Sequence, residues 1–174
     1  MSALLGPVMQ NGYVVDDLET AARHWAEKLG VGPFFVFPGV EFERVRFRGE
    51  DSPIEMSMAI GYWGDLQIEL IKPLNDAPSI YRDFRERGLK GLQHVGVLTR
   101  DLEADLAALA ARGVAPVQEG RAANGTAFAY VDTDFHPGGM VELIEVSPAL
   151  DKGFAMIKAA SVDWDGRDPV RVLG

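Results

Sequence analysis

The chain has 174 residues, of which 47% are hydrophobic, 9% aromatic and 25% charged. This is ordinary globular composition, which excludes collagen, coiled coil and intrinsic disorder, and the length suits one domain or two small modules that share a core. The 17 basic and 26 acidic side chains give a formal net charge of −9, so we expect no nucleic acid and no anionic membrane surface as partner. The absence of cysteine excludes disulfides, thiolate metal sites and cysteine nucleophiles.

The N-terminus does not resemble a targeting segment. Residues 1–7 have no basic n-region and only a two-leucine apolar run, unlike a signal peptide. No stretch approaches the roughly 18 apolar residues that span a bilayer, and the longest apolar segment, residues 31–40, contains Pro33 and Pro38. We therefore expect a cytoplasmic protein.

The first half of the chain shows one helical pattern among strand-like runs. After a β-type run at residues 8–15, Leu18, Trp25 and Leu29 fall at helical spacing, with Asp16 and Glu19 placed as a capping box. Period-two alternation then predicts three strands, at residues 41–48, 54–62 and 66–72.

The second half repeats this order. A strand-like run at residues 92–98 leads into a helix with Leu102, Leu106 and Leu109 on one stripe and Gly113 as its stop. Three strands are again expected, at residues 115–119, 126–132 and 139–145. Outside the two halves we expect a short helix at residues 78–87, another near 153–160, and a turn-rich surface at 163–169.

An internal repeat explains this recurrence. The segment that begins at Gln10 aligns with the one that begins at His94, and a second match aligns residues 68–71 with 141–144. The first alignment pairs Gly12 with Gly96, Asp17 with Asp101, Leu18 with Leu102 and Glu19 with Glu103. We predict two homologous βαβββ modules, residues 1–73 and 92–147, joined by a linker at 74–91 and followed by a tail at 148–174.

Four polar residues are expected to face one another. Strand alternation places Glu69 and Glu142 opposite the apolar faces of their strands, and the repeat gives Gln10 and His94 equivalent positions on the two opening strands. A single polar residue in a strand is usually solvated or hydrogen-bonded in the core. Four that converge about a pseudo-twofold axis are costly to bury unless something satisfies them all.

One imidazole, two carboxylates and one amide oxygen form a ligand set for a single divalent metal ion. The set suits Zn²⁺, Ni²⁺, Co²⁺, Mn²⁺ or Fe²⁺. Two carboxylates neutralise the charge of such an ion and leave coordination positions open for water or a substrate oxygen. The sequence therefore predicts a metal centre at Gln10, Glu69, His94 and Glu142.

The opening motifs, the Glu-Leu-Ile endings and the paired modules resemble the vicinal oxygen chelate superfamily, from Val8 to Pro148. The resemblance implies an α+β fold in which two βαβββ modules form a mixed, half-barrel-like concave sheet with helices on the outside. It also implies the same four metal ligands, although the usual first ligand of the family is His and here it is Gln10. The combination of Gln, Glu, His and Glu is similar to that of some glyoxalase I enzymes.

The linker is similar instead to that of methylmalonyl-CoA epimerases, with a Pro-Leu pair and a serine-containing short helix between the modules. In that resemblance Glu55 matches a strand that carries a catalytic Glu, and so becomes a candidate second base. Pro73 stands where glyoxalase I enzymes usually have an Asn that contacts glutathione, which counts against glutathione.

The resemblance implies a metal-dependent isomerase, epimerase or lyase that removes a proton next to the carbonyl of a small acyl thioester or 2-oxo compound. Glu69 and Glu142 are candidates for both ligand and base. By analogy with the family, the partners are a small-molecule substrate and a second copy of the chain in a homodimer. Arg44, Arg46 and Arg48 alternate on one strand face, where they either hold an anionic substrate or are simply solvated.

Two alternatives stay open. One is a metal-free binding protein of the bleomycin-resistance kind, because this fold hosts both classes. The other is an extradiol dioxygenase, which needs a second His ligand. The two remaining histidines are poorly placed for that role, since His24 lies on the polar side of a helix and His136 lies in a turn that offers at most a substrate contact.

Overall fold

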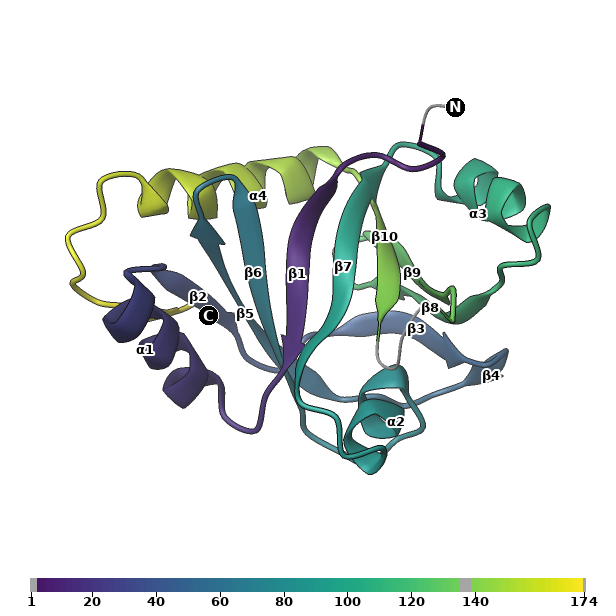
Figure 1. The fold of residues 1–174 in the computed structure, drawn as a ribbon, viewed down its shortest axis with the longest axis horizontal. Helices are drawn as coiled ribbons and strands as arrows, with labels where there is room; N and C mark the ends of the chain where they lie inside the picture. Colours follow the sequence, from purple (N-terminus) through teal and green to yellow (C-terminus); the bar gives the residue numbers. More distant parts are fainter. Residues whose placement is uncertain (1–2, 135–138, 174) are drawn as a thin grey trace.

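The computed structural model describes residues 3–134 and 139–173, which form one curled sheet and four helices (Figure 1). The fold is of the α+β class, as the resemblance implied. The strands are β1 (Val8–Val14), β2 (Phe34–Phe37), β3 (Phe42–Phe47), β4 (Glu50–Asp51), β5 (Met56–Trp63), β6 (Leu66–Pro73), β7 (Gly91–Thr99), β8 (Pro116–Ala122), β9 (Ala127–Asp132), β10 (Met140–Glu145) and β11 (Val170–Val172). The helices are α1 (Leu18–Leu29), α2 (Ile80–Glu86), α3 (Leu102–Ala110) and α4 (Pro148–Ser161).

The sheet has the strand order β11-β2-β5-β6-β1-β7-β10-β9-β8-β3-β4. Its two central strands, β1 and β7, pair antiparallel, and each pairs parallel on its other side, β1 with β6 and β7 with β10. Each half contributes four neighbouring strands, β2-β5-β6-β1 and β8-β9-β10-β7. In both sets the second, third and fourth of these strands in chain order are followed by the first, which lies at the centre of the sheet. This arrangement brings the strands of the four candidate ligands to the centre of the sheet.

The β3–β4 hairpin belongs to the first half of the chain but pairs with a strand of the second half. Residues 41–48 were expected to form a strand within the first half, but β3 pairs with β8 of the second half. Within the first half, β5 pairs with β6 on one side and on the other with β2, which comes from the apolar segment between Pro33 and Pro38. Phe34 and Phe35 are buried on opposite faces, so β2 has none of the alternation that marks a half-buried strand.

The helices α1 and α3 begin at equivalent aspartates. The Asp17 carboxylate accepts a hydrogen bond from the Thr20 backbone N–H, and Asp101 accepts one from Ala104, both at 2.9 Å. The expected cap at Asp16 was therefore one residue too early. Both helices cover the convex face of the sheet, where α1 packs through Leu18 on Ile68 of β6 and α3 contacts β9 and β10.

The C-terminal helix α4, which follows the two modules, lies on the other face of the sheet from α1 and α3. Ile157 of α4 packs against Phe35, Ile60 and Tyr62 on the concave face of the first half. α4 is also longer than the expected helix at residues 153–160, and β11 follows it and pairs with β2. The tail therefore covers part of the concave face.

The linker helix α2 lies at one end of the curled sheet (Figure 1). Ile80 and Tyr81 of α2 are buried in a cluster with residues of β3, β5 and β9. The concave space is thus closed by α2 at one end and partly covered by α4. Among the helices of the described residues, none combines the length and the apolar character that a bilayer span requires.

Candidate metal centre

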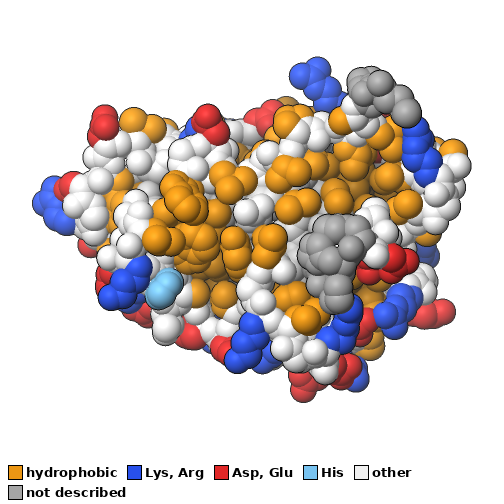
Figure 2. All heavy atoms as spheres, viewed as in Figure 1, with side chains coloured by type: hydrophobic (Ala, Val, Ile, Leu, Met, Phe, Trp, Pro, Cys, Tyr) orange, Lys and Arg blue, Asp and Glu red, His pale blue; other side chains and the backbone are white. Residues whose placement is uncertain are grey.

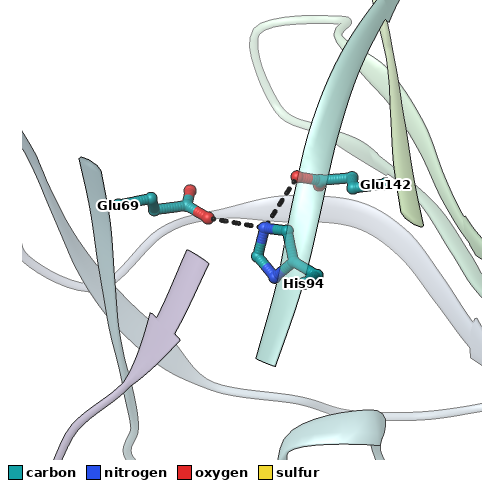
Figure 3. A group of neighbouring side chains, drawn as sticks. All are labelled: Glu69, His94 and Glu142. Atoms are coloured by element: carbon teal, nitrogen blue, oxygen red, sulfur yellow. Dashed lines mark ion pairs between the residues drawn. The ribbon is translucent and has the colours of Figure 1, made fainter. Parts of the chain in front are cut away.

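The structure brings the four predicted ligands together on the concave face. Gln10, Glu69, His94 and Glu142 lie on β1, β6, β7 and β10, and all are at most 7% exposed. His94 Nε2 is 3.3 Å from Glu69 Oε2 and 3.3 Å from Glu142 Oε2, as Figure 3 shows, and it is 3.4 Å from Gln10 Oε1. Three oxygens from three strands therefore surround one ring nitrogen.

Two glycines make this arrangement fit. Glu69, Gly12 and His94 lie in one row across β6, β1 and β7, and Glu142, Gly96 and Gln10 lie in the neighbouring row across β10, β7 and β1. A Cβ atom at residue 12 would lie 1.8 Å from His94 Cε1, and one at residue 96 would lie 2.4 Å from Gln10 Oε1. The glycine of each module thus leaves space for the ligand of the other.

Two carboxylate oxygens of the site have no hydrogen-bond partner within the described residues. They are Glu69 Oε2 and Glu142 Oε2, and both are buried. His94 Nε2 carries at most one proton, which cannot serve the two carboxylates and the amide oxygen of Gln10 at once. Buried carboxylate oxygens without partners are strongly unfavourable, and a cation among them would satisfy all three groups. The donor atoms of Glu69, His94 and Glu142 lie within 4.8 Å of one another, close enough to share an ion.

The carboxylates control the protonation of His94. Burial disfavours the charged imidazolium, but the carboxylates of Glu142 and Glu69, each 3.3 Å from Nε2, outweigh it and raise the pKa of His94 to about 9. Burial, together with the charge of Glu142, raises the pKa of Glu69. In the metal-free protein a protonated His94 therefore supplies positive charge beside the two carboxylates, as a bound cation would.

Neighbouring side chains orient two of the ligands. His94 Nδ1 lies 2.8 Å from Gln93 Oε1, so a proton on Nδ1 leaves the Nε2 lone pair facing the centre. Gln10 Nε2 donates to Gln67 Oε1 at 2.7 Å, and Gln67 Nε2 donates to the Tyr62 hydroxyl at 2.8 Å. These two hydrogen bonds orient the Gln10 amide so that its oxygen faces His94. Sequence reasoning did not identify Gln67 or Gln93 as functional, although each lies within two residues of a ligand.

A cavity of about 110 Å³ opens next to the centre. Gln10, Glu69 and Glu142 lie at its polar end, and its walls are mainly apolar, with Met56 and Met58 of β5 among them. No Lys, Arg or His is among its described lining residues. The hydroxyl of Thr126, whose residue also lines the cavity, is buried and has no hydrogen-bond partner in the described part of the chain. The cavity thus combines an apolar wall with a few polar groups, as small-molecule sites do.

Two tyrosines border the cavity beside the carboxylates. The Tyr81 and Tyr130 hydroxyls lie 2.9 Å apart, and the Tyr130 ring meets the His94 ring edge-on with a centroid separation of 5.1 Å. Burial and the charges of Glu142 and Glu69 raise the pKa of both phenols well above the ordinary value, so both are protonated. Their mutual hydrogen bond uses one O–H, and the other is available to a ligand in the cavity.

Other residues singled out from the sequence lie elsewhere. Glu55 is exposed just before β5, between Ile54 and Met56, which face the cavity, so it lies outside the group around His94. The three arginines of the β3 region do not line the cavity and form ion pairs with carboxylates. Arg44 pairs with Asp51, Arg46 with Asp51 and Glu119, and Arg48 with Asp83. His24 is exposed on α1, and His136 lies outside the described residues.

Three solved structures illustrate which proteins share this fold. A methylmalonyl-CoA epimerase from Mycobacterium tuberculosis is 21% identical, with a TM-score of 0.60 over 87% of this chain and 95% of that one. A hypothetical protein from Bacillus halodurans is 17% identical, with a TM-score of 0.60 over 81% and 94%. A Streptomyces coelicolor methylmalonyl-CoA epimerase in complex with 2-nitronate-propionyl-CoA is 17% identical, with a TM-score of 0.56 over 83% and 96%.

Sequence comparison identifies the family. The chain matches none of the curated protein sequences. The family model of the glyoxalase, bleomycin resistance protein and dioxygenase superfamily matches residues 9–130, which hold three of the four converging residues and most of both halves of the sheet. The chain therefore belongs to the glyoxalase/bleomycin resistance protein/dioxygenase superfamily, in agreement with the resemblance to the vicinal oxygen chelate proteins.

Proposed function

We propose that this protein is a metal-dependent isomerase, epimerase or lyase that removes a proton next to a carbonyl group. The observation that carries the proposal is the pair of buried carboxylate oxygens, Glu69 Oε2 and Glu142 Oε2, that face one imidazole nitrogen and have no hydrogen-bond partner within residues 3–134 and 139–173. A protein that only sequesters an apolar ligand has no physical need for two facing buried carboxylates. The alternative of a metal-free binding protein is therefore second.

Gln10, Glu69, His94 and Glu142 would hold the ion, and their chemistry fits Zn²⁺, Ni²⁺, Co²⁺, Mn²⁺ or Fe²⁺. Such an ion acts as a Lewis acid on a carbonyl oxygen and so makes the neighbouring C–H more acidic. The two carboxylates neutralise its charge. The single His of the set supports an acid–base enzyme over an extradiol dioxygenase, which needs two.

Glu69 and Glu142 are the candidate bases of this chain. Both carboxylates border the cavity, where a bound substrate would present its proton. The free O–H of the Tyr81–Tyr130 pair is placed to donate a hydrogen bond to a developing oxyanion. The apolar walls exclude water, which strengthens both interactions.

The substrate class that we propose is based on the similar structures and on the cavity. Among the solved structures similar to this chain are methylmalonyl-CoA epimerases, one in complex with 2-nitronate-propionyl-CoA. These similar structures support a small acyl thioester as the substrate, with 2-oxo compounds as the second class to test. Removal of a proton from the carbon next to the carbonyl is common to both.

The proposed homodimer has a candidate surface on the convex face. Hydrophobic side chains gather there over the central part of the molecule (Figure 2). The Trp25 ring contacts the rings of Tyr13 and Trp63 at centroid separations of 5.5 and 6.1 Å, and Trp63 is 55% exposed. Exposed apolar patches commonly mark protein interfaces. Light scattering of the chain and of Trp63→Glu tests this assembly separately from the activity.

The metal content tests the proposed function first. We expect about one divalent ion per chain in protein purified without chelator or histidine tag, and its loss in Glu142→Gln and Glu69→Gln. Glu55→Gln is the matched control, because Glu55 is exposed and outside the cavity. Deuterium exchange at the carbon next to the carbonyl of acyl thioesters and 2-oxo compounds then tests the chemistry. No ion in the purified chain, and no uptake of added Zn²⁺, Ni²⁺, Co²⁺ or Mn²⁺, would contradict the proposal.

A further inference from the structure

We propose that the substrate carries an uncharged apolar chain, which lies in a groove between α4 and the segment that joins β2 to β3. The inference rests on the proposed function, since the metal centre would bind the polar end of the same molecule. It concerns the part of the substrate that does not react.

The groove is continuous with the site cavity. It has a volume of about 560 Å³ and shares residues with the cavity on three sides, namely Met58 and Ile60 of β5, Leu150 and Phe154 of α4, and Val40 and Asn124 of two connecting segments. The site cavity alone, at about 110 Å³, is smaller than the roughly 300–1,000 Å³ of most ligand sites, whereas the groove falls within that range. A molecule bound at the carboxylates could therefore extend from the cavity into the groove along α4.

The lining of the groove disfavours a negatively charged ligand. Glu41 is the only charged residue among its described lining residues, and no Lys, Arg or His is present to neutralise an anion. Phe37, Phe154, Ile157 and Leu173 contribute apolar side chains instead. Transfer of each CH₂ group into such a place is favourable by about 0.8 kcal/mol, while a buried unpaired charge is strongly unfavourable.

The helix that forms one wall is fixed in place. Ile157 is 1% exposed in the cluster on the concave face, and Lys158 Nζ lies 2.6 Å from Asp65 Oδ1 at the turn between β5 and β6. Pairing of β11 with β2 holds the segment after α4. The groove is therefore a feature of the folded chain.

Alkyl hydroxamates test the inference, because their two oxygens chelate a metal ion while the chain length varies. With the zinc-loaded protein we expect affinity to rise about threefold to fourfold per added CH₂ from acetohydroxamate to octanohydroxamate. A terminal carboxylate on the longest chain should remove most of this gain. Calorimetry gives the affinities. Equal affinity along the series, or a gain for the charged terminus, would overturn the inference.

A variant in the groove locates the chain. Gly153 of α4 lines the groove, and a Cβ atom there would meet nothing within 4 Å, so Gly153→Phe fills the groove without disturbing the helix. We expect it to weaken octanohydroxamate at least tenfold and to leave acetohydroxamate and zinc binding unchanged. Gly153→Ala is the matched control and should bind the whole series as the natural chain does. Unchanged octanohydroxamate binding by Gly153→Phe would place the alkyl chain elsewhere and overturn the inference.

A second series separates this inference from the proposed function. Primary alcohols of increasing length need no ion and are measured on the metal-free chain, where affinity should again rise with length and fall in Gly153→Phe. If the protein takes up no metal but the alcohols follow this pattern, the proposed function fails and the groove stands. If hydroxamates bind through the metal but neither series depends on length, the groove fails and the metal centre stands.

Discussion

Gly12 lies opposite His94 in the antiparallel pairing of β1 and β7, and a Cβ atom at residue 12 would overlap the imidazole at 1.8 Å from Cε1. The backbone of Gly12 does not have a positive φ, so this glycine is required by space and not by conformation. The same holds for Gly96 and the Gln10 amide, at 2.4 Å. Each opening motif, Gln10-Asn-Gly12 and His94-Val-Gly96, therefore has its polar residue accommodated by the glycine of the other.

Alanine at either glycine should damage the centre. We expect Gly12→Ala to lower the free energy of unfolding by at least about 2 kcal/mol, because the imidazole has to move and the buried core cannot absorb the extra methyl group. Metal uptake should fall with it. Urea denaturation and metal analysis measure the two effects. The control is Gly153→Ala, which replaces a glycine inside α4 with open space around it and should stabilise the chain by about 0.5–1 kcal/mol. A stable Gly12→Ala with full metal content would show that His94 is not held as described.

The outer partner Gln93 should influence metal affinity without touching the ion. Gln93→Leu removes the acceptor next to His94 Nδ1, so the ring loses the contact that fixes its orientation and proton position. We expect metal affinity to fall about 10–100-fold, measured by competition with a chelator of known affinity. Gln118→Leu is a comparison, because Gln118 is also buried but accepts its hydrogen bond from the Ile80 backbone N–H. Equal losses in both variants would mean that the effect is one of general packing.

Metal affinity should rise with pH between about 7 and 9. The pKa of His94 in the metal-free chain is about 9, above the ordinary value of 6.5, so over this range an incoming ion has to displace the proton. The apparent affinity should increase up to about tenfold per pH unit from this group and level off above pH 9. The metal-free chain should behave in the opposite way, because stability from protonated His94 is fully present below pH 6.5 and is lost as the pH rises through 9.

Proton release gives an independent measurement of the same linkage. Calorimetric titration with Zn²⁺ at pH 7, in buffers of different ionisation enthalpy, should show about one proton released from His94 for each ion bound. His94→Gln removes the titrating group and should abolish the pH dependence along with most of the affinity. Tight binding without proton release would contradict the protonation of His94 in the metal-free chain.

The sequence predicts the group of facing polar residues better than the cavity around it. Gln10 and His94 could be found because the repeat aligns them, and Glu69 and Glu142 because a polar side chain interrupts an apolar strand at the same place in each half. These are signals of local spacing. Placing β3 required knowledge of its pairing with β8, a contact between distant segments that no local pattern indicates.

Two further features escaped sequence analysis for physical reasons. β2 is buried on both faces, so its residues do not alternate and the sequence pattern does not distinguish it from a loop between prolines. The amphipathic pattern of α4 indicates that the helix has an apolar side but not which face of the sheet that side covers. The resemblance matches Glu55 along one strand, and such a match does not determine which way a side chain points; the Glu55 side chain is exposed.

The tyrosine pair should show coupled contributions to stability. Tyr81→Phe leaves the Tyr130 hydroxyl buried without its protein partner, and Tyr130→Phe does the same to Tyr81, so each should cost about 1–3 kcal/mol. The double variant removes both hydroxyls and should cost less than the sum of the two. Chemical denaturation of the four proteins gives the coupling energy. Strict additivity would mean that the two hydroxyls do not depend on each other.

The exchange of the β3–β4 hairpin between the halves has a consequence for how the chain acquires its structure. As the protein is synthesised from its N-terminus, β3 is complete long before β8, the strand with which it pairs. One edge of β1 also lacks its partner at that stage, because the antiparallel strand β7 follows the linker. The first half therefore emerges with one edge each of β1, β2 and β3 unpaired, since β2 pairs with β11 near the end of the chain, and its final arrangement requires the second half. The halves repeat one architecture, yet separating them at the linker should yield fragments that fold only on recombining with each other.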